Sequence, residues 1–208
     1  YTKEYSAEYQ SQALIDIAKK LNKKINNLNQ IKKIDIYTSH HTHYVIGTGA
    51  NDPQKMDPKS SRETLDHSIM YIFAVALEDA SWHHVKSYTK SRANKKSTIK
   101  IWKSIKTHED KKWTKKYHDP NPRNKSFGAN VIVTLNNGKT VSEKLERADA
   151  HPYGSRPFKR LDYINKFKIL TKNIISIKET SRFLKIVQNL KNIKKGRLDK
   201  LNIEVNSK

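Results

Sequence analysis

Residues 131–141 read Val-Ile-Val-Thr-Leu-Asn-Asn-Gly-Lys-Thr-Val, two β-branched runs on either side of Asn136-Asn137-Gly138. Asn-Gly between such runs is a strong signal for a hairpin, because glycine readily takes the positive φ that a tight turn requires. We therefore predict two antiparallel strands, Val131–Leu135 and Lys139–Val141. The other patterns in the chain are largely helical, so the predicted fold class is α+β, a small mixed α/β domain.

An amphipathic helix and a strand are predicted near the N-terminus. Apolar residues recur at steps of three and four within residues 8–28, which is the spacing of one helical face. Ile34–Tyr37 then alternates apolar and polar side chains as a half-buried strand does, and we expect this strand to continue into residues 39–44. The stretch 47–58 is rich in Gly, Asn and Pro and is expected to be a loop.

The most apolar stretch of the chain is Ile69–Leu77. It follows Ser60-Ser61-Arg62-Glu63, which has the Ser-x-x-Glu form of a helix capping box, so one largely buried helix is predicted to run from that cap to Leu77. No stretch reaches the roughly 18 apolar residues that span a bilayer, and a transmembrane role is therefore not expected.

The pattern changes after residue 155. Pro157 stands at a plausible first helical position, apolar residues follow at helical spacing, and a last helix is predicted around residues 183–190. These helices have no strand partners in the sequence and too few residues to close a core alone. We expect residues 1–150 to form the α+β domain, and residues 151–208 to pack on something else and to end in a frayed, Lys-rich segment.

The chain is strongly basic, with 42 Lys and Arg against 20 Asp and Glu and a formal net charge of +22. Only 8 of the 42 are Arg, the residue that nucleic-acid readers favour for bidentate contacts. Lys is accompanied by abundant Ile and Asn, as AT-rich codons produce, so we interpret the charge as codon bias and do not expect nucleic acid as a partner. The alternative function is a basic nucleic-acid-binding module, in which aromatic residues of the Lys-rich stretch 90–125 stack on bases. The competing interpretation of that stretch is a Lys-coated segment whose tryptophans pack inward.

Histidine, carboxylate, lysine and tyrosine side chains carry the available chemistry, because the chain has no cysteine. His40, His41, His43 and Tyr44 form the densest titratable cluster. On a strand, His41 and His43 would share one face. Two histidines without a neighbouring carboxylate make a weak metal site, so no metal is expected. Anion binding or acid–base work in a cleft is favoured, and a purely structural role is the remaining alternative.

Two other side chains are candidates for substrate contact. His67 precedes the buried helix, where a core histidine bonded to the backbone is the competing interpretation. Arg156 lies in the Pro- and Gly-containing stretch Asp149–Pro157, close to a helix start, and suits a carboxylate or phosphate. An interdomain hinge is the equal alternative for that stretch.

Four segments of the chain, in unbroken order, resemble one enzyme family. They are Lys3–Ala13, Thr38–Gly49, Ser61–Tyr71 and Ala148–Pro152. Over residues 1–180 the sequence resembles the C-terminal half of the MmgE/PrpD family, which includes 2-methylcitrate dehydratase and cis-aconitate decarboxylase. The resemblance implies a cytoplasmic, homodimeric lyase without a cofactor, which removes water from the tricarboxylate 2-methylcitrate in the methylcitrate cycle of propionate catabolism. Decarboxylation of cis-aconitate is the alternative within the family.

The resemblance also implies an architecture and a set of site residues. The family pairs a large helical domain with a small α/β lid over the active site, and its chain returns to the helical domain at the end. This sequence would then be a C-terminal fragment, inactive without the helical half that holds the general base and acid. Lys3 and Tyr44 are the implied catalytic residues, Lys3 for a substrate carboxylate or developing charge and Tyr44 for the leaving hydroxyl or a carboxylate. The implied substrate contacts are His41, His43 and His67, in addition to Arg156.

Overall fold

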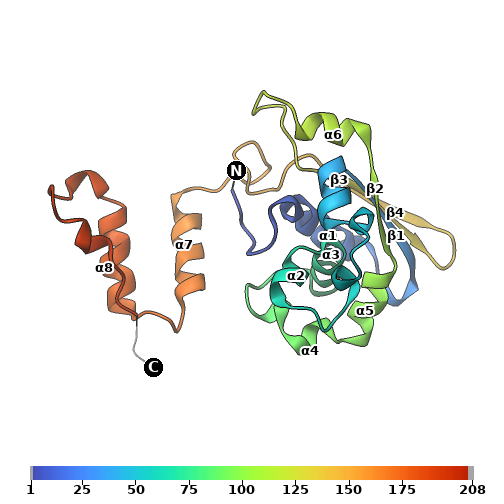
Figure 1. The fold of residues 1–208 in the computed structure, drawn as a ribbon, viewed down its shortest axis with the longest axis horizontal. Helices are drawn as coiled ribbons and strands as arrows, with labels where there is room; N and C mark the ends of the chain where they lie inside the picture. The colour runs from blue at the N-terminus through green and yellow to red at the C-terminus, as the bar shows by residue number, and fades with distance from the viewer. Residues whose placement is uncertain (1, 206–208) are drawn as a thin grey trace. The chain divides into compact units, whose positions relative to one another are not determined.

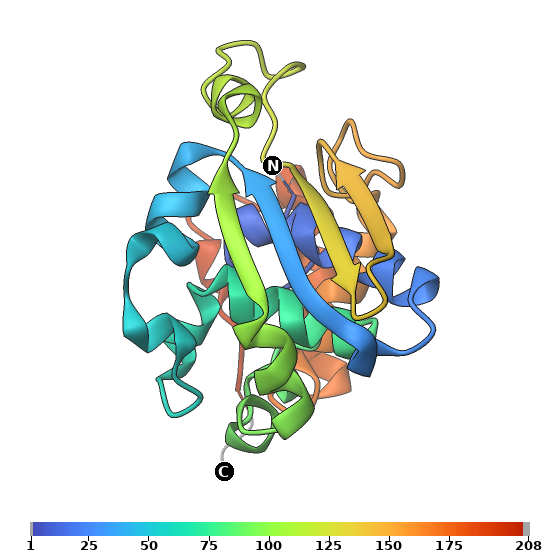
Figure 2. The ribbon, with the colours of Figure 1, turned by 90° about the vertical axis from the view of Figure 1, so that its right-hand side faces the viewer.

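The computed structural model describes residues 2–205. The chain divides into two compact units, Tyr1–Pro157 and Phe158–Lys208. In the first unit, helices cover one face of a four-stranded sheet (Figures 1 and 2). The strands are β1 (Ile31–Thr38), β2 (Ile105–Glu109), β3 (Ala129–Leu135) and β4 (Thr140–Leu145).

The sheet has the order β2-β1-β3-β4, with β1 parallel to β2 and antiparallel to β3. β3 and β4 form the antiparallel hairpin, and Gly138 in its turn has a φ of 82°. The α+β fold class, the hairpin and the strand at Ile34–Tyr37 are therefore confirmed. Figure 2 looks onto the open face of the sheet, and the helices lie behind it.

The first unit has six α-helices and six short helical turns among its described residues. They are η1 (Tyr9–Ser11), α1 (Gln12–Lys24), η2 (Leu28–Gln30), η3 (Thr42–Ile46), η4 (Thr48–Ala50), η5 (Pro53–Met56), α2 (Arg62–Asp66), α3 (Ile69–Asp79), η6 (Lys86–Tyr88), α4 (Lys90–Ala93), α5 (Lys96–Lys103) and α6 (Lys111–Tyr117). The first predicted helix is confirmed but shorter than expected, because Ile25 already has extended backbone.

The core lies between the sheet and the helix pair α1 and α3. Leu14, Ile17 and Leu21 of α1 are buried, as is the whole run Ile69–Leu77 of α3. These residues meet the inward side chains of the sheet in one continuous cluster. Fully burying such a side chain contributes about 1.5–3 kcal/mol, so α3 is the main apolar element of the fold. The predicted burial of Ile69–Leu77 is confirmed.

The prediction of one helix running from the Ser60 cap is wrong. The cap is Ser61, whose Oγ accepts from the N–H of Thr64 at 3.2 Å, and α2 then ends at Asp66. Ser68 caps a separate helix, α3, by accepting from the N–H of Tyr71 at 3.2 Å and donating to the Lys55 carbonyl at 2.7 Å. Ser68 thus competes with the helical hydrogen-bond ladder, and the chain breaks there.

The prediction that residues 39–44 continue the strand is also wrong. β1 ends at Thr38, and the chain then winds into a wide π-helical turn, η3. The buried side chains Thr42 and Ile46 are four residues apart, so the inward face follows a helical period instead of the alternation of a strand. His41 and His43 therefore do not share a strand face.

Glu78 near the end of α3 is a half-buried carboxylate that accepts several hydrogen bonds. Burial opposes its ionisation, but hydrogen bonds from Ser97, Thr98 and Lys95 and the charge of Arg92 outweigh burial and lower the Glu78 pKa to about 2. Glu78 Oε2 lies 2.8 Å from Arg92 Nη2, and Oε1 lies 3.0 Å from Lys95 Nζ.

Acid is expected to weaken the fold through Glu78. Because the folded pKa is lower than the usual value of 4.5, the stabilisation is complete above pH 4.5 and is lost as the pH falls toward 2. Allowing for solvent screening, we expect about 1–2 kcal/mol. The free energy of unfolding should fall less steeply between pH 5 and 2 in Glu78→Gln than in the parent. If the free energy of unfolding fell equally steeply with pH in both proteins, Glu78 would not be the source of the acid sensitivity.

The second unit is a helical pair, α7 (Arg160–Thr171) and α8 (Ile177–Val187), followed by η7 (Leu190–Asn192) and η8 (Leu198–Leu201). Phe167 of α7 and Phe183 of α8 stack with their ring centroids 5.2 Å apart. Both predicted helices are present, although α7 begins at Arg160 and not at Pro157.

Much of the apolar surface of this unit is not covered. The exposed fraction is 70% for Leu161, 58% for Ile169 and 87% for Ile177. The docking of these helices on another domain stays a prediction. Between residues 2 and 205, no helix combines the length and the apolar character needed to cross a membrane.

Candidate active site

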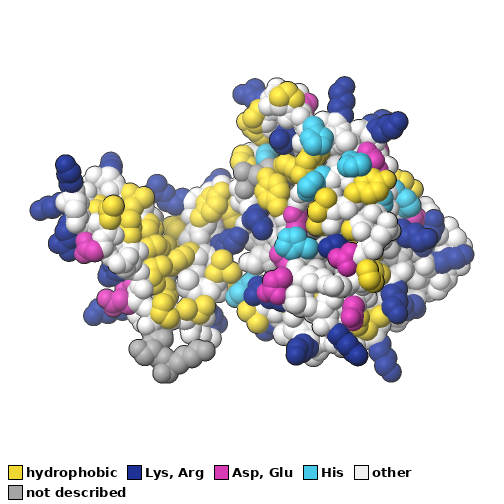
Figure 3. Space-filling model, viewed as in Figure 1, with side chains coloured by type: hydrophobic (Ala, Val, Ile, Leu, Met, Phe, Trp, Pro, Cys, Tyr) yellow, Lys and Arg dark blue, Asp and Glu magenta, His cyan; other side chains and the backbone are white. Residues whose placement is uncertain are grey.

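The carboxyl ends of the two parallel strands lie side by side, with Thr38 of β1 paired to Glu109 of β2. η3 follows β1 and α6 follows β2. Histidine side chains, cyan in Figure 3, gather on the face that carries these two segments. Carboxyl ends of neighbouring parallel strands bring successive loops together and are common ligand sites. This edge of the sheet is therefore the candidate active site.

His40 is held by a carboxylate at this edge. Its Nδ1 lies 2.9 Å from Glu109 Oε2, a residue 69 positions away in the chain. The hydroxyl of Thr114 in α6 donates to Glu109 Oε1 at 3.0 Å and accepts from the backbone N–H of His40 at 2.8 Å. The hydrogen bond from His40, together with that from Thr114, lowers the pKa of Glu109.

His43 and His41 have different surroundings from His40. His43 Nδ1 lies 2.7 Å from Thr107 Oγ1, and a Cβ atom at Gly49 would come within 2.5 Å of His43 Nε2. Burial lowers the pKa of His43, which favours the neutral imidazole. His41 stacks on Tyr117 at 5.3 Å between ring centroids. Within residues 2–205, no group of three or more His, Asp or Glu side chains is arranged to hold a metal ion.

Tyr44 stands between two of these histidines. Its ring centroid lies 4.5 Å from that of His40 and 4.5 Å from that of His43. Its exposed fraction is 48%, so the phenol is available to a ligand. The structure thus brings together the predicted residues His41, His43 and Tyr44, all on one turn.

The N-terminal segment is held in place by Gln12, which is buried at the start of α1. Gln12 Oε1 accepts from the N–H of Tyr5 at 3.0 Å, and Nε2 donates to the carbonyls of Tyr5, Ala7 and Glu8 at 3.1–3.2 Å. Trp82 Nε1 donates to the carbonyl of Ser6 at 3.1 Å. These contacts fix the backbone that carries Lys3 and Glu8.

Glu8 is a candidate that sequence patterns do not single out. Burial raises its pKa, while the backbone N–H groups of Gln10 and Tyr9 and the charges of His67 and Lys3 oppose that rise. Glu8 therefore sits in the field of two predicted site residues. A Glu before a helical turn ordinarily suggests a cap, and the Glu8 side chain does accept from the N–H of Gln10.

Gln10 connects the N-terminal segment to the histidine turn. Its side-chain amide lies between the Glu8 carboxylate and the Tyr117 hydroxyl, and the amide oxygen accepts from that hydroxyl at 3.2 Å when the nitrogen faces Glu8. Tyr117 in turn stacks on His41. One chain of contacts therefore joins Glu8 to the histidine turn.

His67 and Arg156 lie at the surface. His67 is exposed and its Nδ1 is 2.9 Å from the carbonyl of Glu63, so it is not a core histidine. Arg156 Nη2 lies 2.7 and 2.6 Å from the two carboxylate oxygens of Glu4, beside Lys3 in the chain. The structure therefore places Arg156 with the N-terminal segment.

The loop before Arg156 is anchored on α1. Asp16 Oδ2 accepts from the N–H of Asp149 at 2.8 Å, and Asp16 Oδ1 accepts from the Tyr5 hydroxyl at 2.6 Å. Burial raises the pKa of Asp16. The Asp149 side chain itself accepts from the Ser155 hydroxyl at 2.7 Å, within the same loop.

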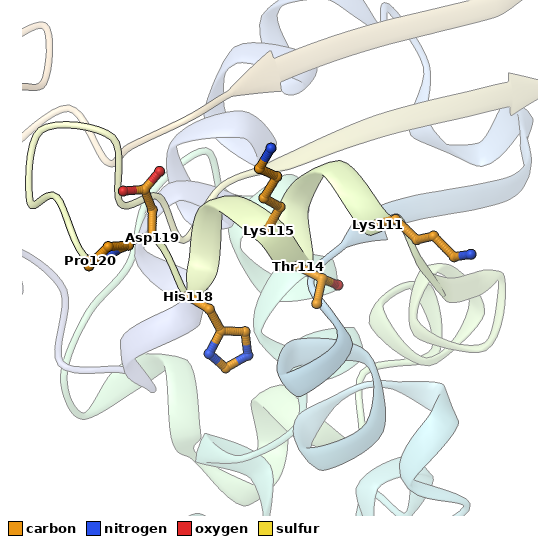
Figure 4. Close-up of a pocket in the computed structure, with 6 residues that line it drawn as sticks. All are labelled: Lys111, Thr114, Lys115, His118, Asp119 and Pro120. Atoms are coloured by element: carbon orange, nitrogen blue, oxygen red, sulfur yellow. The ribbon is translucent and has the colours of Figure 1, made fainter.

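A shallow groove of about 480 Å³ runs along α6 (Figure 4). The residues that line it are Lys111, Thr114, Lys115, His118, Asp119 and Pro120. Thr114 and His118 point to the same side of α6. Because Thr114 also contacts Glu109 and His40, this side of α6 adjoins the candidate site, whereas Lys115 points to the other side of the helix.

The tryptophans of the Lys-rich stretch are buried. Trp102 and Trp113 belong to the interior, and the Nζ atoms of Lys116 and Lys144 lie 5.8 and 5.5 Å from the Trp113 ring. The prediction that these tryptophans pack inward is confirmed. A row of tryptophans on which bases could stack is therefore not formed by this pair.

A comparison with known protein families finds a match that covers most of the chain. The model of the MmgE/PrpD C-terminal domain matches residues 5–192, which includes most of both structural units. The match extends beyond residue 180, where the resemblance was expected to end, and it begins just after Lys3. The segments Thr38–Gly49, Ser61–Tyr71 and Ala148–Pro152 lie fully within the match. The chain therefore belongs to the MmgE/PrpD family and carries its C-terminal domain.

Proposed function

We propose that this chain forms the lid side of the active site of a hydro-lyase that converts 2-methylcitrate to 2-methyl-cis-aconitate. Membership of the MmgE/PrpD family supports a hydro-lyase-type role in general terms. The observation that carries the proposal, beside the match, is the turn with His41, His43 and Tyr44 at the carboxyl ends of β1 and β2.

The chemistry of the substrate accounts for the residue types. Dehydration requires a base for a C–H proton, an acid for the departing hydroxyl and cations for three carboxylates. In the proposal Lys3 binds a carboxylate or the developing charge, and Tyr44 donates to the leaving hydroxyl. His41, His43 and His67 are secondary contacts. Arg156 would bind a substrate carboxylate beside Glu4, which its Nη2 already contacts.

The proposal includes a helical partner domain. The exposed apolar residues of α7 and α8, including Leu161, Ile169 and Ile177, are what a docked helical surface would cover. In the proposal the surface that docks on α7 and α8 belongs to the helical half of the same enzyme. That enzyme acts as a cytoplasmic homodimer without a cofactor. The alternative within the family is decarboxylation of cis-aconitate. The same assembly can be tested for that reaction.

The chain alone is expected to show no appreciable dehydration of 2-methylcitrate. Combined with the helical half, in one polypeptide or as two, it should dehydrate the substrate without added metal, because the two halves then supply cations, acid and base together. The ultraviolet absorbance of the unsaturated product measures the rate, and carbon dioxide release from cis-aconitate tests the alternative. Robust turnover by the 208-residue chain alone, or an inactive assembly, would contradict the proposal.

A further inference from the structure

We propose that His40 and Glu109 form an acid–base dyad at this site, in which Glu109 orients the imidazole and His40 Nε2 exchanges a proton with the substrate. The substrate in this inference rests on the proposed function, whereas the dyad rests on the geometry of the described residues. His40 belongs to the titratable cluster that the sequence shows, whereas Glu109 was not a candidate from the sequence. The dyad places the base on this chain, although the resemblance implied a base in the helical half. His40 is the proposed catalytic residue and Glu109 is a positioning residue.

Two residues from two other elements, His40 after β1 and Thr114 in α6, close a ring of hydrogen bonds with Glu109. His40 Nδ1 is 2.9 Å from one carboxylate oxygen, the Thr114 hydroxyl is 3.0 Å from the other, and that hydroxyl accepts from the His40 N–H at 2.8 Å. The pKa of Glu109 is lowered by these bonds, so the carboxylate stays ionised and can only accept. The proton of the neutral imidazole must therefore sit on Nδ1, which leaves Nε2 as a base.

His40 Nε2 is available for proton exchange. The exposed fraction of the His40 side chain is 57%, and within the described part of the chain Nε2 makes no hydrogen bond. Tyr44 and His43 face His40 from its own turn, Glu109 faces it from β2, and α6 presents the neutral Thr114. An oriented imidazole beside an exposed phenol is the pairing that proton transfer requires.

The other histidines lack this combination. His43 has a hydroxyl partner in place of a carboxylate and is packed against Gly49, and His41 stacks on Tyr117. His108 Nε2 does lie 2.9 Å from Asp35, but Asp35 is shared with Lys33 at 2.8 Å, and the pair lies within the strands β1 and β2 and not on the turn after them. His108 is therefore a matched control for His40.

The proposed reaction balances without an oxidant or reductant. His40 Nε2 takes the proton from the carbon next to the one that bears the hydroxyl. The C–H electron pair becomes the new C=C bond, and the C–O bond breaks. The leaving hydroxyl takes the Tyr44 proton and departs as water. The phenolate then recovers a proton from the imidazolium beside it, which restores both side chains.

The first test measures the tautomer of His40 in the chain itself and needs no activity. Nitrogen-15 NMR at a pH where the imidazoles are neutral should show His40 with its proton on Nδ1. In the same spectrum His108, bonded through Nε2, should carry its proton on Nε2. Glu109→Ala should move the His40 proton largely to Nε2 and leave His108 unchanged. A parent His40 already protonated on Nε2, or no change in the variant, would overturn the dyad.

The second test uses the assembled enzyme. His40→Asn keeps a donor for Glu109 but removes Nε2, and it should lower kcat about 10²- to 10⁴-fold, the usual contribution of a general acid or base, with little change in KM. The fall of kcat on the acid side of the pH profile should disappear. His108→Asn should change neither value. If the parent is active and His40→Asn has an unchanged kcat, the dyad is overturned but the proposed dehydration is not. If the parent assembly is inactive, the proposed function is contradicted, and the dyad is then judged by the tautomer measurement alone.

Discussion

Replacing Lys3 by alanine is expected to raise the transition-state free energy of the assembled hydro-lyase by about 2–5 kcal/mol, the range for losing one partner of a desolvated, hydrogen-bonded charge pair. That corresponds to a loss of about 30- to 5,000-fold in kcat/KM. Lys3 is exposed in the chain alone. We expect the effect in the assembly because Lys3 directly precedes the segment that Gln12 fixes, and because its charge acts on the half-buried Glu8.

The matched control for Lys3 is Lys96. Lys96 is exposed at the start of α5, within the Lys-rich stretch, so Lys96→Ala removes the same charge from a solvated position and should cost almost nothing. Rates would be followed by the absorbance of the unsaturated product. A Lys3→Ala variant as fast as the parent, or a Lys96→Ala variant as slow as Lys3→Ala, would show that the cationic part of the site lies elsewhere.

Replacing Gln12 by leucine is expected to lower the free energy of unfolding by about 3–6 kcal/mol. Leucine fills a similar volume but removes the acceptor for the Tyr5 N–H and the donors for the Tyr5, Ala7 and Glu8 carbonyls. Each buried backbone group left without a partner costs about 1–3 kcal/mol, and the total is less than the sum because some groups will find water. Such a loss is a large share of the stability of an ordinary domain.

Urea unfolding followed by circular dichroism would measure this loss. Gln10→Leu is the matched control, since Gln10 is also a buried glutamine of this segment but contacts only Glu8 and Tyr117 with its side-chain amide. We expect Gln10→Leu to cost about 1 kcal/mol, the ordinary net value of one hydrogen bond. Equal losses in the two variants would mean that Gln12 does not hold the segment.

The elements that the sequence predicts are those with a local signal. The hairpin depends on Asn136-Asn137-Gly138 and the strands next to it, and α3 depends on a run of apolar residues long enough to need burial. β2 escapes prediction because only Ile105 and Thr107 of its five residues are buried, so it lacks an apolar alternation. Its partner β1 is distant in the chain, and a parallel pair leaves no turn signal between them.

The residues of the candidate site also divide into those with a local sequence signal and those without one. The histidines and Tyr44 are visible in the sequence because they are neighbours, and Lys3 is visible only through resemblance to a family. Glu109 cannot be assigned to His40 from the sequence, because 69 residues separate them and only the parallel pairing of β1 and β2 brings them together. Gln12 is uncharged and lies on an amphipathic helix, where nothing marks it as the residue that holds four backbone groups.

The strand order β2-β1-β3-β4 also sets which contacts of the sheet are local in the chain and which are distant. The β3–β4 hairpin joins residues as close as Val133 and Val141 and can form within about 1–10 μs. β1 must instead pair Ile34 with Ile105 and Ile36 with Val131, and the entropy of closing such long loops has to be met before these contacts stabilise the chain. We therefore expect the docking of β1 to be the slow step. Since His40 follows β1 closely, it reaches Glu109 only once β1 and β2 have paired.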